Sequence, residues 1–351
     1  MSQNRFDDLL NQPTSAAIVM RQPMMPVEGE GGVIYPPTFA GSKESEKSGY
    51  NIDTLNTGES GKPRNVCLID SVGSQANRIE PLFKRTPYCD LVPQIQIRVK
   101  TKEVEELVHL FDAGHRIADA VARCSELLGE IQEAFLAVKS GNCEPLARLA
   151  PTSLVFGVWD SRGTQVKLPR IVRSTIRALN VQPLTRSAQY IPAINYSESG
   201  VLNEEEAKKG AEQGFNHVPS THNPGGVLLV DDSQVLREAV LSLSALRALR
   251  AESDEMTAKL QRYILGLSLV ALTAPQEPLL RMGCELTGDP EKPATWEQVA
   301  CTGQREAFNL SHGDALAFAQ AAATDFGVAE GRVVDFNAKK AKDSLKKKEK
   351  K

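Results

Sequence analysis

The chain has 351 residues, of which 41% are hydrophobic, 24% are charged and only 5% are aromatic. This composition is typical of globular domains and excludes mostly disordered, collagen-like and disulfide-scaffold proteins. The low aromatic content also argues against a function that depends on many stacked rings.

The formal net charge of −3 is unevenly distributed along the chain. Eight of the last fourteen residues are lysine, so residues 1–337 are clearly acidic and residues 338–351 clearly basic. We predict a single domain over 1–337 and a disordered Lys-rich tail over 338–351. Such a tail adds nonspecific affinity for polyanions without forming a site.

The cysteine pattern indicates reduced thiols and a cytoplasmic protein. The six cysteines are widely spaced and form no CxxC pair, which argues against structural disulfides and zinc sites. The first residues contain no apolar signal-peptide core, and no run approaches the 18 apolar residues that a membrane span needs. We therefore expect no membrane partner, no metal and no cofactor.

The hydrophobic pattern predicts helices and strands in irregular alternation. Helices are predicted over 5–10, 71–83, 112–139, 254–272 and 314–326. Strands or β-like segments are predicted over 16–20, 65–70, 94–100, 153–159, 171–180, 188–196, 227–230 and 279–286, whereas 236–249 fits either a strand or a helix. The fold class is therefore α+β, because the regular βα alternation of a doubly wound sheet is absent.

Two segments look like insertions into this core. Residues 42–64 are rich in Ser, Gly, Glu, Lys and Asn and read as a flexible loop. Residues 198–226 combine an acidic helical stretch over 198–215 with a Pro-, Gly- and His-containing loop over 216–226. Long segments of this kind in compact domains are functional or disordered.

The most informative stretch for function is residues 161–197, which contain no Asp or Glu. Clustered cations without acids favour phosphate binding, because neutralised phosphates release condensed counterions. Neutral side chains between the cations add hydrogen bonds to phosphate and sugar oxygens. The candidates here are Arg162, Gln165, Lys167, Arg170, Arg173, Arg186 and Gln189. The alternative is a solvated basic face that binds nothing in particular.

A second candidate is the predicted strand-to-helix junction over 70–78. Its small and polar residues leave backbone N–H groups free for an anion at a helix start, although a simple capped helix explains them equally well. The candidates are Ser71, Ser74, Gln75, Asn77 and Arg78, with His115 and Arg116 as weaker ones. No catalytic motif or pair of catalytic carboxylates stands out, so we assign no catalytic residue.

Several of these segments together resemble the RAMP-superfamily backbone subunit of the type I-G (formerly I-U) CRISPR Cascade complex. They are YPPTFAG over 35–41, residues 65–83, GHRIADA over 114–120, residues 149–180, RSAQYIPA over 186–193, GFNHVP over 214–219 and GGV over 225–227. The block APTSLVFGVWDSRGTQVKLPRIVRSTIRA over 150–178 is the most specific. The similarity covers most of residues 15–290 and excludes the 42–64 loop and the tail.

The resemblance implies an RRM-like (ferredoxin-like) palm with long finger and thumb insertions. It implies a subunit that polymerises head to tail along the spacer of a CRISPR guide RNA and presents it for base pairing with target DNA in antiviral defence. The implied partners are the guide RNA, target DNA through the guide, further copies of the chain, the guide-processing and large Cascade subunits, and a recruited helicase-nuclease. The 42–64 loop or the 198–226 insertion would supply the finger or thumb.

The resemblance implies a subunit without nuclease activity, so we expect no enzyme. One alternative is a RAMP-type metal-dependent endoribonuclease acting on target RNA, for which Asp53, Asp70 and Asp160 are available. A further alternative is an enzyme that binds a phosphate-bearing ligand through residues 71–78.

Overall fold

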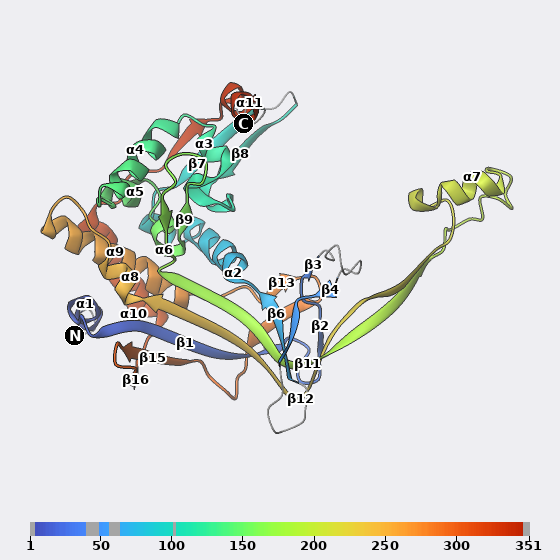
Figure 1. Cartoon of the computed structure of the whole chain (residues 1–351), viewed down its shortest axis with the longest axis horizontal. Helices are drawn as coiled ribbons and strands as arrows, with labels where there is room; N and C mark the ends of the chain where they lie inside the picture. Colours follow the sequence, from blue (N-terminus) through green and yellow to red (C-terminus); the bar gives the residue numbers. More distant parts are fainter. Residues whose placement is uncertain (1–3, 40–48, 56–63, 101–102, 347–351) are drawn as a thin grey trace.

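The computed structural model describes residues 4–39, 49–55, 64–100 and 103–346. Helices and a small sheet form a body that stands on one end of a twisted antiparallel sheet (Figure 1). Two strands of that sheet continue beyond the body as a long arm, and helix α7 (Glu204–Lys209) lies at the tip of the arm.

Four antiparallel strands form the centre of the main sheet. Their spatial order is β1 (Ser15–Pro26), β12 (Val218–Ser242), β11 (Val172–Tyr190) and β6 (Arg64–Asp70). Shorter strands extend it, namely β2 (Val33–Ile34), β5 (Ile52–Leu55), β13 (Leu279–Arg281), β14 (Cys284–Gly288), β15 (Thr295–Ala300) and β16 (Arg305–Ala307). The mixed α and β class is thus confirmed.

The two faces of the sheet differ because side chains alternate along a strand. The register places Val19, Val240 and Arg173 side by side, and their neighbours Ile18, Leu241 and Val172 on the opposite face. The second set is buried under the helices. The first face carries an open surface with exposed Arg21, Arg173 and Arg177. One sheet face is therefore covered and the other is open.

The core lies between the covered face and two long helices. Helix α9 (Asp254–Thr273) is buried from Tyr263 to Leu272. Its own side chains in this part are apolar on nearly every face, which is typical of a helix inside a core. Helix α10 (His312–Phe326) packs directly against it, with Ala319 facing Gly266. The remaining helices of the body are α1 (Asn4–Asn11), α2 (Val72–Ile79), α3 (Ala120–Arg123), α4 (Leu128–Lys139), α5 (Glu144–Leu149), α6 (Thr152–Phe156) and α8 (Leu243–Arg247).

Three small sheets complete the structure. Strand β7 (Ile95–Lys100) pairs antiparallel with β8 (Glu105–His109) and parallel with β17 (Arg332–Asp335). Strands β9 (Val158–Trp159) and β10 (Lys167–Leu168) form a short hairpin, and β3 (Thr38–Phe39) pairs with β4 (Gly49–Tyr50).

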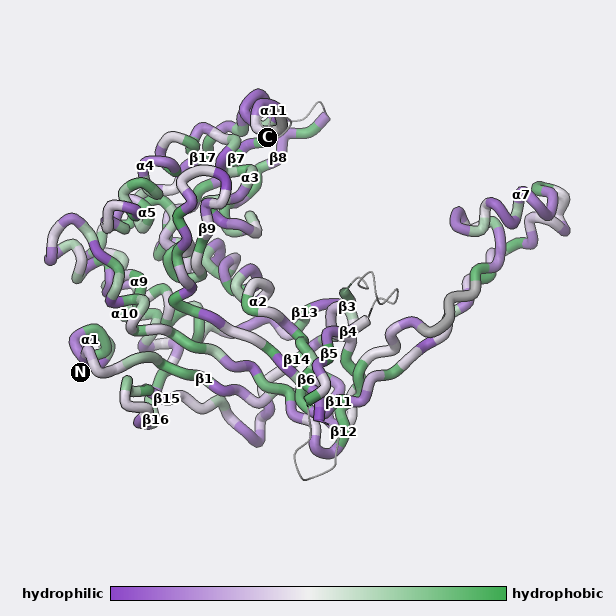
Figure 2. The backbone as a smooth tube through the Cα atoms, in the orientation of Figure 1, coloured by the Kyte–Doolittle hydropathy of each residue, from purple (hydrophilic) through white to green (hydrophobic). Residues whose placement is uncertain are grey.

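The arm is the outer half of the β11–β12 hairpin. Every residue of β11 from Thr185 to Tyr190 is exposed, and the pairing continues to Tyr190 opposite Val218. Hydrophilic residues recur along the arm and at its tip (Figure 2). The tip holds its own contacts, since the Tyr196 and Phe215 rings meet edge to face with centroids 5.2 Å apart.

Two predicted elements of the body need correction, the first in its continuity and the second in its type. The segment predicted as one helix over 112–139 is divided into several short elements. They are two 3-10 turns (Leu110–Asp112 and Arg116–Ala118) followed by the α-helices α3 and α4. The helix is interrupted because Arg116 has a φ of 54° and Asp119 is the N-cap of α3. The predicted strand over 153–159 is mostly α6, which is buried on all sides. A short apolar run does not distinguish a buried helix from a buried strand.

The predictions for the insertion and the tail also need correction. The loop expected over 216–226 belongs mostly to β12, because pairing with β11 carries a Pro- and Gly-containing sequence into a strand. In the tail expected to be disordered, residues Ala338–Lys346 form helix α11. Most of the 42–64 loop lies outside the described residues, which include only residues 49–55, with β4 and β5, and Arg64 from it.

We predict that Gly266→Ala destabilises the protein. A Cβ at this position would lie 2.8 Å from the Ala319 Cα, so α9 and α10 would have to separate. The overpacking cost of about 1–3 kcal/mol exceeds the gain in helix propensity of about 1 kcal/mol. Urea unfolding should therefore show a lower midpoint. Gly313→Ala in α10 is the matched control, because its Cβ would meet nothing within 4 Å; an equal loss in both variants would contradict the prediction.

Candidate nucleic-acid interface

The junction between β6 and α2 is built around a capped helix start. The Ser71 hydroxyl accepts a hydrogen bond from the Ser74 backbone N–H at 3.2 Å, so Ser71 is the N-cap of α2. Ser71, Asn77 and Arg78 are exposed at this helix. The capped-helix interpretation of the sequence is thus confirmed, and binding by the exposed residues stays a prediction.

Asp70 is buried beneath this helix start and is fully engaged. Its carboxylate accepts from Gln75 Nε2 at 2.7 Å, Arg78 Nε at 3.1 Å and Arg281 Nη2 at 3.3 Å. Gln75 is only 3% exposed and also accepts from the Ser174 hydroxyl. Gln75, predicted as a surface contact for RNA, therefore points inward, because it bridges α2 and β11.

Arg116 connects three segments that lie far apart in the sequence. Its Nε lies 2.7 Å from Glu80 Oε2 in a buried ion pair, and its Nη2 donates to Asn77 Oδ1 at 3.3 Å. Its Nη1 donates to the Gly157 carbonyl at 3.4 Å. Arg116, expected as a weak contact for RNA, is thus a buried structural residue, whereas neighbouring His115 is exposed.

Burial controls the ionisation of this pair. It raises the pKa of Glu80 to about 7, and Arg116 and Thr152 oppose the shift. Burial also lowers the pKa of Arg116, with the positive charge of Arg170 as a smaller contribution in the same direction. Arg170 packs against Gly157, whose carbonyl accepts a hydrogen bond from Arg116.

The β9–β10 hairpin presents a different set of groups to solvent. Asp160 is buried and accepts from the N–H groups of Gly163 and Thr164, which fixes the turn between the strands. Trp159 is 57% exposed, and the Lys167 Nζ lies 5.5 Å from its ring centroid. Trp159 was not among the candidates from the sequence. An aromatic residue close to an acid-free cationic segment could have indicated it as a base-stacking residue.

The cations of the acid-free segment do not share one groove. Arg162 and Lys167 lie on the β9–β10 hairpin, Arg173 projects from the open sheet face, and Arg186 lies on the arm with Gln189. These four cations and Arg170 are exposed, and none has an acidic partner among the described residues. Arg177, by contrast, lies 3.9 Å from Glu238. Gln165 is exposed on the hairpin, with a φ of 64°.

The candidate carboxylates for a nuclease differ in their availability. Asp70 and Asp160 are buried and held by the contacts described above, whereas Asp53 is exposed on β5. Over the described residues, no three His, Cys, Asp or Glu side chains gather as metal ligands. In that same part of the chain, no helix has the length and apolarity to cross a membrane.

The exposed groups are suited to a single nucleic-acid strand. Unpaired cations attract the phosphate backbone, and an exposed indole offers a face on which a base stacks. The interface would consist of the β9–β10 hairpin and the adjoining surface of Arg170, with Arg173 and the arm as separate cationic regions.

Comparison with known proteins finds a similarity between part of the chain and a family of CRISPR-associated proteins. Residues 18–183, slightly less than half of the chain, match the family model of CRISPR-associated protein GSU0053 (Cas_GSU0053). This segment runs from β1 into β11 and includes α2, Arg116 and the β9–β10 hairpin. It excludes Arg186 and most of the arm. No curated protein matches the chain.

We predict a pH-dependent stability difference between the wild type and Glu80→Gln. Because the pKa of Glu80 rises from 4.5 to about 7 on folding, the folded state binds this proton more tightly than the unfolded state. The stability contribution of the group is therefore present at low pH and is lost as the pH rises through this window.

Urea unfolding of both proteins between pH 4 and pH 8 measures the effect. The wild-type free energy of unfolding, relative to that of the variant, should fall by at most about 1.4 kcal/mol per pH unit and become constant above the folded pKa. A difference that grows with pH would mean that Arg116 keeps Glu80 ionised throughout.

Proposed function

We propose that this chain is a CRISPR RNA-binding backbone subunit of the RAMP superfamily, from a type I-G Cascade complex. In this proposal the main sheet and its helices form an RRM-like palm, and copies polymerise head to tail along the guide spacer. The guide is then presented for base pairing with target DNA. The chain would assemble with the guide-processing and large Cascade subunits, and a helicase-nuclease would be recruited to cut.

The observation that carries the proposal is the exposure of the acid-free segment. Five of its cations face solvent without an acidic partner among the described residues, although acidic side chains outnumber basic ones in the whole chain. A surface arginine that only stabilises the fold is expected to form an ion pair with a carboxylate of the same chain, as Arg177 does with Glu238. Cations kept free in this way favour contacts with a phosphate backbone.

The arm supports assembly into a filament. It projects away from the body, and its outer end exposes Tyr190, Ile191 and Ile194. Exposed apolar side chains at the end of a projecting hairpin are suited to contact with a neighbouring copy. A contact between the arm of one copy and the body of the next is heterologous, so it repeats along the guide instead of closing on itself.

The proposal assigns binding to this chain and no catalytic step. Asp70 and Asp160 already accept several hydrogen bonds each, which leaves few lone pairs for a metal ion. The exposed cations contact the backbone, so they would carry no sequence information. Sequence reading is left to base pairing between guide and target, as in other RNA-guided complexes.

We predict that Arg170→Ala combined with Arg173→Ala weakens binding of single-stranded guide RNA. Each lost phosphate contact should reduce the slope of log affinity against log salt by about 0.7. Filter-binding titrations from low to high salt, with two unrelated spacer sequences, measure both quantities. The loss should be the same for both sequences.

The matched control for this experiment is Arg305→Ala combined with Arg332→Ala. These arginines are also exposed, but each is paired, with Glu297 and Glu130 respectively. The control should keep the wild-type slope. An unchanged slope in the Arg170 and Arg173 variant would show that neither arginine contacts the phosphate backbone of the guide.

We predict that Trp159→Ala also lowers RNA affinity, because base stacking on an aromatic ring is worth about 1–3 kcal/mol. The expected loss is about 5- to 150-fold, with little change in the salt slope, since no charge is removed. Trp159→Phe should retain most of the affinity. Equal affinities for the wild type and the alanine variant would show that no base stacks on Trp159.

A further inference from the structure

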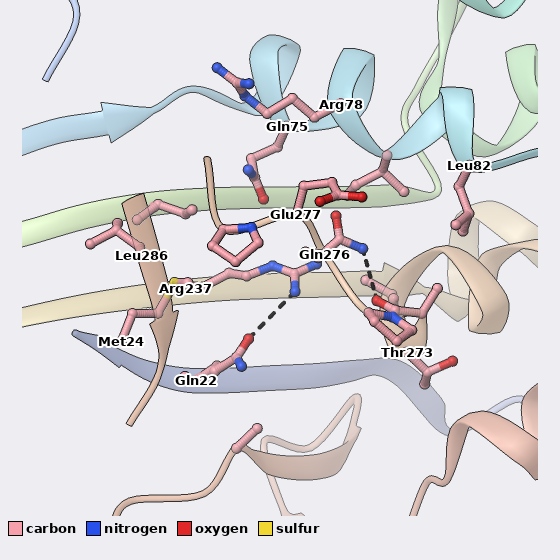
Figure 3. Close-up of a pocket in the computed structure, with 18 of the residues that line it drawn as sticks. Gln22, Met24, Gln75, Arg78, Leu82, Arg237, Thr273, Gln276, Glu277 and Leu286 are labelled. Atoms are coloured by element: carbon pink, nitrogen blue, oxygen red, sulfur yellow. Dashed lines mark hydrogen bonds between the residues drawn. The ribbon is translucent and has the colours of Figure 1, made fainter. Parts of the chain in front are cut away.

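A cavity of about 650 Å³ lies between the covered face of the main sheet, helix α2 and the segment that follows α9 (Figure 3). Its walls combine apolar and polar side chains, and the apolar ones include Met20, Met24, Ile79, Leu82 and Leu286. A volume of this size is typical of sites for small organic ligands. The cavity is on the opposite side of the sheet from Arg173.

Arg237 of β12 lies at the base of this cavity. The residue is only 5% exposed, and its side chain extends between Gln22 and Gln276 (Figure 3). Its Nε donates to the Ser174 hydroxyl at 3.3 Å, and its Nη1 donates to Gln22 Oε1 at 3.4 Å. Its Nη2 is buried and has no hydrogen-bond partner among the described residues.

No carboxylate neutralises Arg237 in the part of the chain that the structure describes, whereas the other arginines of the cavity are paired. Arg78 binds Asp70, and Arg85 binds Glu277 at the rim. Burial lowers the pKa of Arg237 to about 10, so the guanidinium stays charged at neutral pH. A buried charge is costly to the folded protein unless an opposite charge and hydrogen bonds compensate it.

We propose that this cavity binds a small monoanion that has a carboxylate attached to an apolar body. The carboxylate would accept hydrogen bonds from Arg237, and the apolar body would lie against the methionine and leucine side chains. A planar carboxylate matches the fork geometry of a guanidinium. A single unpaired cation, with Glu277 at the rim, favours one negative charge over a phosphate dianion.

The cavity is separate from the proposed RNA interface, although Gln75 and Arg78 line it from α2. Both side chains are held by Asp70. The proposed RNA interface and the proposed anion site can therefore be tested separately. Loss of RNA binding after substitutions on the β9–β10 hairpin would not affect the proposal for the cavity.

Isothermal titration of the full-length protein with sodium octanoate tests the proposal. The wild type should bind octanoate at least tenfold more tightly than 1-octanol, which has the same apolar body without the charge. Arg237→Met should lose this preference. The variant should also unfold at an equal or higher temperature without ligand, because an unpaired buried charge has been replaced by an apolar side chain.

Arg21→Met is the matched control, since Arg21 lies next to Gln22 on β1 but projects from the open face and pairs with Glu238. It should bind octanoate as the wild type does. If Arg237→Met does not fold, Met24→Trp tests the site by filling the cavity, and it should abolish octanoate binding.

Three results would overturn the proposal. They are equal affinity for octanoate and 1-octanol in the wild type, unchanged octanoate binding in Arg237→Met or in Met24→Trp, and binding of inorganic phosphate in preference to octanoate. Loss of guide RNA binding in Arg237→Met, with no octanoate binding by the wild type, would instead place the cavity on the RNA path.

Discussion

The pairing of β11 with β12 is the interaction on which the rest of the structure depends. It runs from Val172 opposite Leu241 in the core to Tyr190 opposite Val218 at the end of the arm. In the body this ladder fixes which residues face the helices and which face solvent. Beyond the body the same ladder carries the arm, which has little core of its own. One set of backbone hydrogen bonds thus builds both the centre of the main sheet and the arm proposed to reach a neighbouring copy.

Buried charge explains why several conspicuous polar residues are not surface contacts. Asp70 joins β6, α2 and β13 through Gln75, Arg78 and Arg281. Glu80 and Arg116 join α2 to the turn before α3. The first group fixes the start of α2, and Arg116 also bonds the Gly157 carbonyl directly before the β9–β10 hairpin. Arg237 differs from both sets, because its charge is buried and yet unpaired by any described carboxylate, and this difference led to the inference of an anion site.

The candidate interface was only partly predictable from the sequence. The absence of acids over 161–197 indicated a cationic segment, and five of its cations are exposed without an acidic partner among the described residues, whereas phosphate binding by them stays a prediction. The cations are distributed over the β9–β10 hairpin, the open sheet face and the arm. This distribution depends on which strands pair, in which register, and on which face each side chain lies, and the sequence alone does not give these. Gln75 and Arg116 were expected at the surface but are buried. The sequence does not reveal this, because Gln75 bonds Ser174 and Arg116 pairs with Glu80, and both partners are distant in sequence.

The sequence by itself determined the α+β class, the long helices α9 and α10 and the acid-free character of one segment, because composition and helical periodicity are local properties. Only the tertiary structure decided that 153–156 is helical, that the Pro- and Gly-containing stretch after residue 217 is a strand, and that Arg237 lies buried beside a cavity. These outcomes depend on contacts between distant segments, such as β11 with β12 and α2 with the sheet. The energy of such contacts outweighs local propensity, and no short window of sequence contains both partners.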